Sequence, residues 1–492
     1  MGSTRIFDRK ALSLITHETA AALGVLPFAI APDGTLLALC ETPGDLERAE
    51  RLRMAARRPS ALVQAGAGLR DEIERAYGEL ALGDNISLSE DIFSGGGAEL
   101  SSATEDDDSP IARTVDLIID KAVGERASDV HIEPADGASR VRFRVDGRLG
   151  EALSFPSGIH KAVAARIKVM AKLDIAEKRR PQDGRIMKRV AGREVDLRVS
   201  TLPTVHGENI VIRILDRQMT PLDIDSLGAL PSSVGRIKRL LACKNGLILV
   251  TGPTGSGKTT TLNAMLNALD LKRFSAVTVE DPVEYDIAGA SQVQVNESAG
   301  VTFAVALRHI LRQDPDIILC GEIRDEETAR LAIRAALTGH LVLATIHAND
   351  AASVPARLGD IGVQPFLTAQ VLRGVIAQGL VRNLCPRCKK PVVWERESLK
   401  SVLRGNVVYE PVGCPRCGGR GFFGRSAVFE IMECDGEMSE MLASNAPSSR
   451  LREYARRHGM GTLEENALEM AANGTTCVDE ALGTGLAYAQ GD

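Results

Sequence analysis

The stretch LILVTGPTGSGKTT, residues 247–260, decides the fold of this chain. It contains the pattern G-x-x-x-x-G-K-[ST] at residues 252–259, preceded by the apolar strand Leu247–Val250 and followed by the predicted helix Thr260–Leu269. The glycines let the backbone turn so that its N–H groups face phosphates, and the N-terminus of the helix adds positive potential. The stretch therefore predicts a phosphate-binding loop.

The loop also predicts how a nucleotide is held. We expect Lys258 to reach the β and γ phosphates of ATP and the Thr259 hydroxyl to ligate Mg²⁺. The expected nucleotide contacts are Gly252, Pro253, Thr254, Gly255, Ser256, Gly257, Lys258, Thr259 and Thr260.

The segments that follow repeat a strand–turn–helix pattern. Apolar runs at Ala276–Val279, Ile317–Cys320 and Leu341–Thr345 each precede a polar or glycine-containing turn and a helical segment. Continuous apolar runs are typical of strands that are buried on both faces. The pattern predicts an α/β domain with a parallel sheet covered by helices, over residues 221–492.

Polar side chains follow each of these strands. Glu280 and Asp281 end the first, Glu322 follows the second, and His347 follows the third. The carboxyl ends of parallel strands form the edge where α/β sheets bind ligands. We therefore predict that Glu280, Glu322 and His347 are catalytic, with His347 sensing the γ-phosphate. The alternatives are solvated loop charges for the acids and a packed or solvated ring for the histidine.

Three further regions precede the ATP-binding domain. Residues 1–82 mix short helices and strands and form a small N-terminal α/β domain. Residues 83–109 are rich in serine, glycine and acidic side chains, which predicts a flexible linker. Residues 110–220 combine amphipathic helices with alternating strands such as Val195–Val199, which predicts an α+β domain.

Composition narrows the function further. A chain of 492 residues is too long for one core. A net charge of −6 and 3% aromatic residues argue against a nucleic-acid binder. We find no membrane span and no signal pattern, so we expect a cytoplasmic protein whose membrane contact is peripheral or made through partners.

Four of the nine cysteines form two C-x-x-C pairs, Cys385 with Cys388 and Cys414 with Cys417. Without an export signal, such pairs indicate a metal site before they indicate disulfides. Four thiolates suit a tetrahedral structural Zn²⁺, and redox pairs or buried cysteines are the alternatives. We expect an inserted zinc module at residues 384–425, followed by a helical region at 435–492.

Several separated motifs together resemble one family. Thr278–Glu284 resembles an "Asp box", Ile317–Asp325 a Walker B segment, and Thr338–Asp350 a "His box". Arg180–Arg185 reads RPQDGR, and Asp196–Glu208 reads DLRVSTLPTVHGE. In this order, the motifs resemble the assembly ATPases of type II secretion systems and type IV pili, the GspE/PilB family. The resemblance extends over roughly residues 110–485 and is greatest for the type II secretion ATPases.

The resemblance implies a RecA-like P-loop core, a preceding PAS-like α+β domain and a hexameric ring. Arg198 and Arg213 would then contact phosphates as catalytic residues. Gly321 stands where many unrelated P-loop proteins have an acid, and this family also has glycine there. Glu322 would polarise the attacking water, and Glu280 would share the metal or the water, with Asp281 as the alternative.

Two choices stay open within the resemblance. Arg308 and Arg312 are both candidates for offsetting charge at the nucleotide. The function is either pseudopilus assembly and protein export by a type II secretion system, which we favour, or type IV pilus extension. In both cases the N-terminal domain would dock on inner-membrane platform proteins.

Two alternatives come from other classes of protein. A regulatory protein that binds nucleotide without turnover would be expected to lack Lys258, Thr259 or Glu322, and all three are present. A nucleic-acid translocase with a zinc-knuckle contact is disfavoured by the acidic composition and the scarcity of aromatic residues.

Overall fold

The computed structural model describes residues 7–65, 68–70, 72–78, 80–81, 109–215, 223–394 and 407–489. Except for Ser109, the predicted linker at residues 83–109 lies outside these ranges. The chain divides into two compact units, one of residues 1–218 with 412–421 and one of residues 219–411 with 422–492. Among the described helices, none has the length and apolar character needed to cross a membrane.

The N-terminal part of the first unit contains a three-stranded sheet in the order β1-β2-β3. Strands β1 and β2 are antiparallel, and β2 and β3 are parallel. The strands and helices are β1 (Val25–Ile30), β2 (Leu36–Cys40), β3 (Ser60–Gln64), α1 (Arg9–Leu12), α2 (His17–Leu23) and α3 (Leu46–Ala56). Thr16 begins α2 because its side-chain oxygen accepts a hydrogen bond from the backbone N–H of Thr19.

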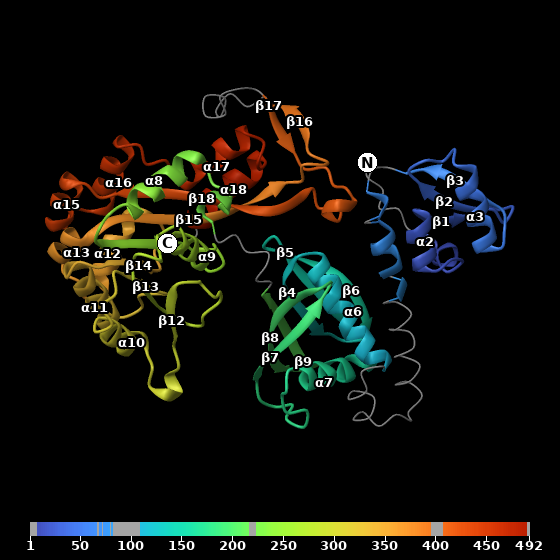
Figure 1. The fold of residues 1–492 in the computed structure, drawn as a ribbon, viewed down its shortest axis with the longest axis horizontal. Coiled ribbons are helices and arrows are strands. Elements are labelled where there is room, and N and C mark those ends of the chain that lie inside the picture. The colour runs from blue at the N-terminus through green and yellow to red at the C-terminus, as the bar shows by residue number, and fades with distance from the viewer. Residues whose placement is uncertain are drawn as a thin grey trace. The chain divides into compact units, whose positions relative to one another are not determined.

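The first unit also contains a six-stranded antiparallel sheet in the order β6-β5-β4-β9-β8-β7. Its elements are β4 (Ala127–Pro134), β5 (Ala138–Val145), β6 (Arg148–Pro156), β7 (Gln182–Val190), β8 (Arg193–Thr204), β9 (Gly207–Leu215), α6 (Pro110–Gly124) and α7 (His160–Met170). Both helices pack on one face of this sheet (Figure 1).

Alternation along the strands of this sheet separates its two faces. Leu197 and Val199 on β8 are buried in the core beneath the helices. Side chains of successive strand residues point to opposite faces, so Arg198 lies on the face away from the helices. The regular pattern that predicted this strand therefore also places an arginine on the face opposite α6 and α7.

The second unit is built on a seven-stranded sheet in the order β12-β11-β13-β14-β10-β15-β18. All neighbours are parallel except β15 and β18, which form an antiparallel pair. The strands are β10 (Gly246–Thr251), β11 (Ala276–Glu280), β12 (Ala290–Gln294), β13 (Ile317–Cys320), β14 (Leu341–Thr345), β15 (Leu372–Leu384) and β18 (Phe422–Glu433). The predicted parallel sheet is thus present, and its four predicted strands lie within two residues of their expected bounds.

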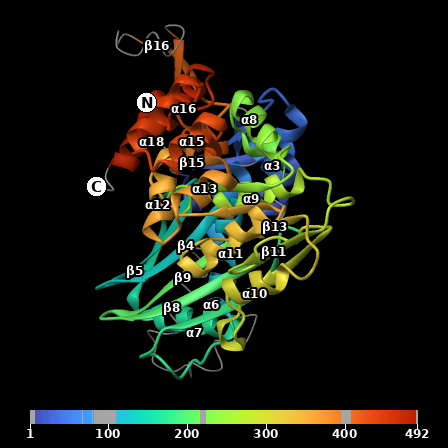
Figure 2. The ribbon, with the colours of Figure 1, turned by 90° about the vertical axis from the view of Figure 1, so that its left-hand side faces the viewer.

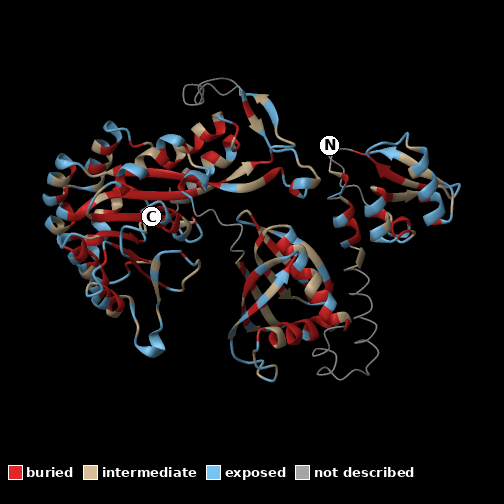
Figure 3. Cartoon of the chain, viewed as in Figure 1, coloured by how far each residue is buried: buried red, intermediate tan, exposed pale blue. Residues whose placement is uncertain are grey.

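Helices cover both faces of this sheet, which explains the unbroken apolar runs. Leu247 and Leu249 of β10 pack in one core cluster with α10, α11, α12, α13, α15 and α16, whereas Ile248 and Val250 pack in another with α8 and α9. Figure 3 shows the central strands buried along their whole length. Helix α10 packs beside β11 and β13, and α11 packs beside β10 and β14; both helices can be followed in Figures 1 and 2.

The helices of this unit are α8 (Pro231–Leu241), α9 (Lys258–Asn267), α10 (Phe303–Ile310), α11 (Glu326–Leu337), α12 (Val354–Asp360), α13 (Pro365–Val371), α15 (Gly436–Ala443), α16 (Ser448–Arg457), α17 (Leu463–Ala472) and α18 (Val478–Ala489). Helices α17 and α18 pack in a separate cluster with residues of β15 and β18. A two-stranded sheet of β16 (Lys390–Val393) and β17 (Val407–Glu410) lies in sequence between β15 and β18.

Candidate active site

The phosphate loop joins β10 to α9 as the sequence predicts. Gly252, Gly255 and Gly257 have φ values of 142°, 80° and 85°. Residues other than glycine rarely adopt these positive φ values, so the path of the loop requires glycine at these three positions. The Lys258 Nζ donates to the carbonyl oxygens of Gly252 and Pro253, at 2.8 and 3.0 Å. Thr259 is exposed at the first turn of α9.

Glu322 follows β13 at the same edge of the sheet, where it contacts Arg324 and lies close to His347. One carboxylate oxygen forms an ion pair with Arg324, and the other lies 3.9 Å from the Nε2 of His347. The Glu322 side chain is only 16% exposed. Burial lowers the pKa of Lys258, while the negative charge of Glu322 acts to raise it. The structure thus brings Glu322 and His347 together and places Glu322 within electrostatic reach of the loop lysine.

His347 is half exposed at the end of the segment after β14. Burial of its ring and the positive charge of Lys258 lower the pKa of His347 below its usual value. The ring is therefore neutral at pH 7 and retains one nitrogen that accepts a hydrogen bond and one that donates.

Threonine hydroxyls hold the strand ends of this edge together. Thr251, the last residue of β10, donates to the carbonyl of Ala348 and accepts from its N–H, both at 2.9 Å. Thr345 donates to the carbonyl of Gly321 at 2.6 Å. These bonds fix the segments that carry the phosphate loop, Glu322 and His347 relative to one another. Sequence reasoning missed both threonines, although each is a hydroxyl residue at a strand end.

Glu280 ends β11 and is 3% exposed. Its Oε1 accepts hydrogen bonds from Thr278 Oγ1 at 2.7 Å and from Gln292 Nε2 at 2.9 Å. Its Oε2 is buried and has no hydrogen-bond partner among the residues that the structure describes. Buried carboxylate oxygens are nearly always paired, so this oxygen marks a position where a polar ligand or water belongs. Gln292 on β12 was not anticipated, because that strand was not predicted.

Gly321 lies directly after β13, at the position where many unrelated P-loop proteins have an acid. A Cβ atom there would lie 3.2 Å from the carbonyl oxygen of Val279 and 3.4 Å from the Cα of Glu280. The first distance is tighter than ordinary van der Waals contact and the second is at its lower limit, so the close approach of β13 to β11 favours glycine.

The arginines of the six-stranded sheet lie in one row. Arg185, Arg198 and Arg213 are direct partners across β7, β8 and β9, and Asp129 on β4 is opposite Arg213. Direct cross-strand partners share a face, so all four residues project from the face opposite α6 and α7. Arg213 is 65% exposed, and its Nε lies 3.4 Å from Asp129. Arg185 was not predicted as a member of this row, because its partner strand can be assigned only from the register.

Arg185 has a separate partner within the sheet. It forms two hydrogen bonds of 2.6 Å with the buried carboxylate of Asp196. Arg198 and Arg213 are the two members of the row that were predicted to contact phosphates.

Arg308 on α10 and Arg312, which follows α10, are the two candidates for offsetting charge at the nucleotide, and each has a partner nearby. Arg308 forms an ion pair with Glu327 on α11. Arg312 lies 2.7 Å from the Nδ1 of His309. Neither contact favours one arginine over the other.

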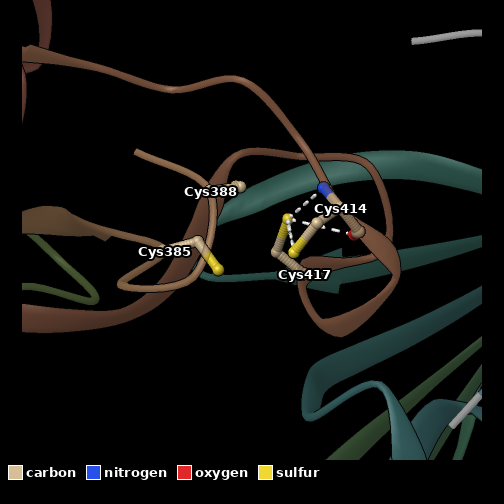
Figure 4. A group of neighbouring side chains, drawn as sticks. All are labelled: Cys385, Cys388, Cys414 and Cys417. Carbon is tan, nitrogen blue, oxygen red and sulfur yellow. Dashed lines mark hydrogen bonds between the residues drawn. The ribbon is translucent and has the colours of Figure 1, made fainter. Parts of the chain in front are cut away.

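The four paired cysteines form a cluster (Figure 4). Their sulfur atoms, from Cys385, Cys388, Cys414 and Cys417, all lie within 4.8 Å of one another. The Sγ atoms of Cys414 and Cys417 are 3.7 Å apart, close to the edge of about 3.8 Å expected for four sulfurs at about 2.3 Å from one Zn²⁺. The Cys417 sulfur also accepts backbone N–H bonds from Cys414 and Gly421, at 3.1 and 3.2 Å. The cluster is therefore compatible with a zinc ion.

Comparison with known proteins places this site in a family. The model of a family described as "Type II/IV secretion system protein" matches residues 104–483, well over half of the chain. The chain belongs to this family. The matched residues include the phosphate loop, Glu322, His347, the arginine row and the four cysteines.

Three relatives of this chain are named as secretion or pilus proteins. Type II secretion system protein HxcR of Pseudomonas aeruginosa is 48% identical over 376 residues, covering 76% of this chain and 77% of the relative. Type II secretion system ATPase E of Vibrio cholerae is 44% identical, covering 77% and 76%. Type IV pilus assembly ATPase PilB of Myxococcus xanthus is 39% identical, covering 96% and 86%. The predicted family and the prediction of a secretion or pilus ATPase are confirmed.

Solved structures agree at the level of the fold. The ATPase DotB of Legionella pneumophila matches 76% of this chain and 95% of its own, with a TM-score of 0.57 and 21% identity. The pilus retraction motor PilT, solved with bound ADP, matches 75% and 95%, with a TM-score of 0.50 and 25% identity. The mixed α/β architecture predicted from the sequence is that of these ATPases.

Proposed function

We propose that this chain is the motor ATPase of a type II secretion system, in which ATP hydrolysis drives pseudopilus assembly and protein export. One observation carries the proposal. The phosphate loop, Glu322 and His347 meet at one edge of a parallel sheet, in a chain 48% and 44% identical to two type II secretion proteins. This edge is where parallel α/β sheets bind their ligands.

The chain's own groups divide the work of phosphoryl transfer. The N–H groups of the loop over residues 252–260 hold the phosphates, and Lys258 offsets their charge. Thr259 would hold Mg²⁺, which when bound would supply further positive charge to the phosphates. Glu322 orients the attacking water through its carboxylate, and neutral His347 hydrogen-bonds to the γ-phosphate.

Glu280 takes a supporting part in the same reaction. The Oε2 atom of Glu280 is buried with no hydrogen-bond partner in the described part of the chain, and such an oxygen would be available to a water at the nucleotide site. Asp281 remains the alternative, and it follows Glu280 directly.

We further propose a hexameric ring in which the row of arginines meets a nucleotide. Arg198 and Arg213 lie side by side on the helix-free face of their sheet, and Arg213 is largely exposed. Exposed guanidinium groups on such a face can donate paired hydrogen bonds to phosphate oxygens. Within this proposal residues 110–220 form a PAS-like domain and residues 221–492 a RecA-like domain, with Arg308 or Arg312 as a further cation.

We assign Zn²⁺ to the four cysteines as a structural ion. Four sulfurs leave no open position for substrate, so the ion would fix the turns of residues 384–425 rather than take part in hydrolysis.

The remaining assignments concern location. We propose that residues 1–82 dock on inner-membrane platform proteins and that the chain works in the cytoplasm, without nucleic acid. The compact fold of this region around its own core supports a separate docking domain.

Pilus extension is the second candidate function, because the pilus assembly ATPase of Myxococcus xanthus is 39% identical over 96% of the chain, including the N-terminal region. A type II secretion system protein E of Aeromonas hydrophila is 39% identical over 94% of the chain, so the length of the alignment does not separate the two candidates.

A genetic experiment separates the two candidates. The gene is deleted in its own organism and restored as the wild type or as Glu322→Gln. We expect the deletion and the variant to lose secreted proteins from the culture medium and to keep surface pili. Loss of pili with normal secretion would favour pilus extension, and no change in either would contradict both candidates.

A further inference from the structure

Strand β15 runs directly alongside the phosphate loop. It is the parallel partner of β10, and Thr251 lies opposite Ala377. The residues that follow these two, Gly252 and Gln378, are therefore neighbours. A Cβ atom on Gly252 would lie 2.4 Å from the carbonyl oxygen of Gln378. The loop therefore leaves the sheet against the backbone of β15 at this residue.

The side chain of Gln378 reaches the opposite limb of the same loop. Its Nε2 donates a hydrogen bond of 2.7 Å to the carbonyl oxygen of Ser256, and the side chain is 1% exposed. A Cβ atom on Gly257 would lie 3.0 Å from that Nε2. The missing side chains at Gly252 and Gly257 thus make room for one glutamine, whose backbone touches the start of the loop and whose amide binds its end.

This hydrogen bond sets the orientation of a phosphate-binding group. In a trans peptide unit the C=O and the following N–H point in opposite directions. When the carbonyl of Ser256 is held toward β15, the N–H of Gly257 is turned away from β15, toward the concave side of the loop. Backbone N–H groups at this position of a phosphate loop are the donors that hold phosphate oxygens.

We propose that Gln378 is a positioning residue of the phosphate loop, which acts by orienting the Ser256–Gly257 peptide unit for phosphate binding. Gln378 itself does not touch the nucleotide. Loss of its donor frees this peptide to rotate, so that Gly257 N–H must be reoriented each time a nucleotide binds. Small misplacements of a binding group can reduce rates by about a hundredfold.

The test uses the full chain and compares Gln378→Leu with Thr476→Val. The control residue is buried and donates a hydrogen bond of 2.8 Å to the carbonyl of Arg382, which is on the same strand and outside the loop. Each variant removes one buried donor to a backbone carbonyl. Measurements are the dissociation constant of fluorescent ADP, kcat and KM for ATP, and the melting temperature with and without ADP.

We expect both variants to lower the melting temperature of the nucleotide-free protein. Only Gln378→Leu should weaken ADP binding, by about tenfold or more, and reduce the rise in melting temperature that ADP produces. Wild-type ADP affinity in Gln378→Leu, or equal weakening in Thr476→Val, would overturn the proposal. Turnover by the wild-type protein is measured alongside, so that failure of the ATPase assignment is distinguishable from failure of this proposal.

In a second variant, Gln378→Glu, lowering the pH restores a hydrogen-bond donor at this position. Gln378→Glu carries no donor when ionised, whereas its protonated carboxyl has one O–H that can donate to Ser256. Burial favours the protonated form, so ADP affinity relative to the wild type should rise as the pH falls from about 8 to about 6. An affinity ratio that is constant over this range would contradict the proposal, and this arm does not require Gln378→Leu to fold.

Discussion

At the scale of single residues, the charged groups around Glu322 are the ones most closely tied to the proposed hydrolysis. Its carboxylate contacts Arg324 and lies close to His347, and it also acts on the pKa of Lys258. Arg324 is 63% exposed, so water can take its place when Glu322 turns to a bound water and a nucleotide.

Glu322→Gln keeps the shape of the side chain and removes its charge. We expect ATP binding to persist and hydrolysis to fall by about a hundredfold or more, because an amide does not accept a proton from water. Fluorescent nucleotide binding and phosphate release are measured on the same preparation. Normal turnover, or complete loss of binding, would show that Glu322 has a different role.

Lys258→Ala removes a cation from the phosphate loop and little core packing. In the absence of nucleotide, Lys258 bonds only to carbonyls of its own loop among the contacts described, at Gly252 and Pro253. We therefore expect turnover to fall by at least about a hundredfold and the melting temperature to change by only a few degrees. Arg239→Ala, on the exposed side of α8, is the matched control and should retain turnover. A variant that hydrolyses ATP like the wild type would refute the ATPase assignment.

At the scale of elements, β15 and β18 connect the active-site edge to the cysteine cluster. β15 carries Gln378 beside the loop and ends at Leu384, directly before Cys385, while Arg382 near its end pairs with Glu480 of α18. The turn at Cys414–Cys417 is short, and the N–H groups of Cys414 and Gly421 donate hydrogen bonds to the Cys417 sulfur. Such turns are stabilised chiefly by the metal that the thiolates bind.

Cys414→Ser tests whether the four cysteines hold a structural zinc ion. Metal analysis of the wild type should give about one zinc per chain, with Zn–S distances of about 2.3 Å by X-ray absorption. The variant should lose the zinc and melt at a lower temperature, yet bind ADP with wild-type affinity, because no cysteine touches the phosphate loop in the described contacts. Cys243→Ser is the control, since Cys243 is outside the cluster. Wild-type protein without zinc, or with disulfides between these cysteines, would contradict the assignment.

At the scale of the whole molecule, the proposed hexamer predicts an activity that depends on assembly. Arg213 is exposed and only loosely paired with Asp129, so it is available to a phosphate. If that phosphate is reached only within the ring, dilution should lower the specific activity of the wild type.

Arg213→Ala is the corresponding variant. We expect its turnover to fall by more than about tenfold while ADP binding by the phosphate loop changes little, because the arginine offsets charge that develops during hydrolysis. Fusion to a hexameric scaffold should restore activity to dilute wild type but not to the variant. Arg140→Ala, an exposed arginine on β5 outside the row, is the control. Specific activity that stays constant on dilution, together with an active variant, would mean that Arg213 only pairs within its own sheet.

The sequence by itself determined the parts of this protein that depend on local patterns. The spacing of Gly252, Gly257 and Lys258 predicts the loop, because the turn requires residues without side chains. The apolar runs predict strands buried on both faces, and the paired cysteines predict their own cluster.

Only the tertiary structure decided which distant residues complete the site. Gln378 contacts Ser256, and Thr251 contacts Ala348, across parallel strands whose order in the sheet differs from their order in the chain. Likewise, Arg185 joins the row with Arg198 only through the register of β7 and β8. A local pattern shows which residues of a strand share a face. It does not show which strand lies beside it, because pairing is set by packing over the whole sheet.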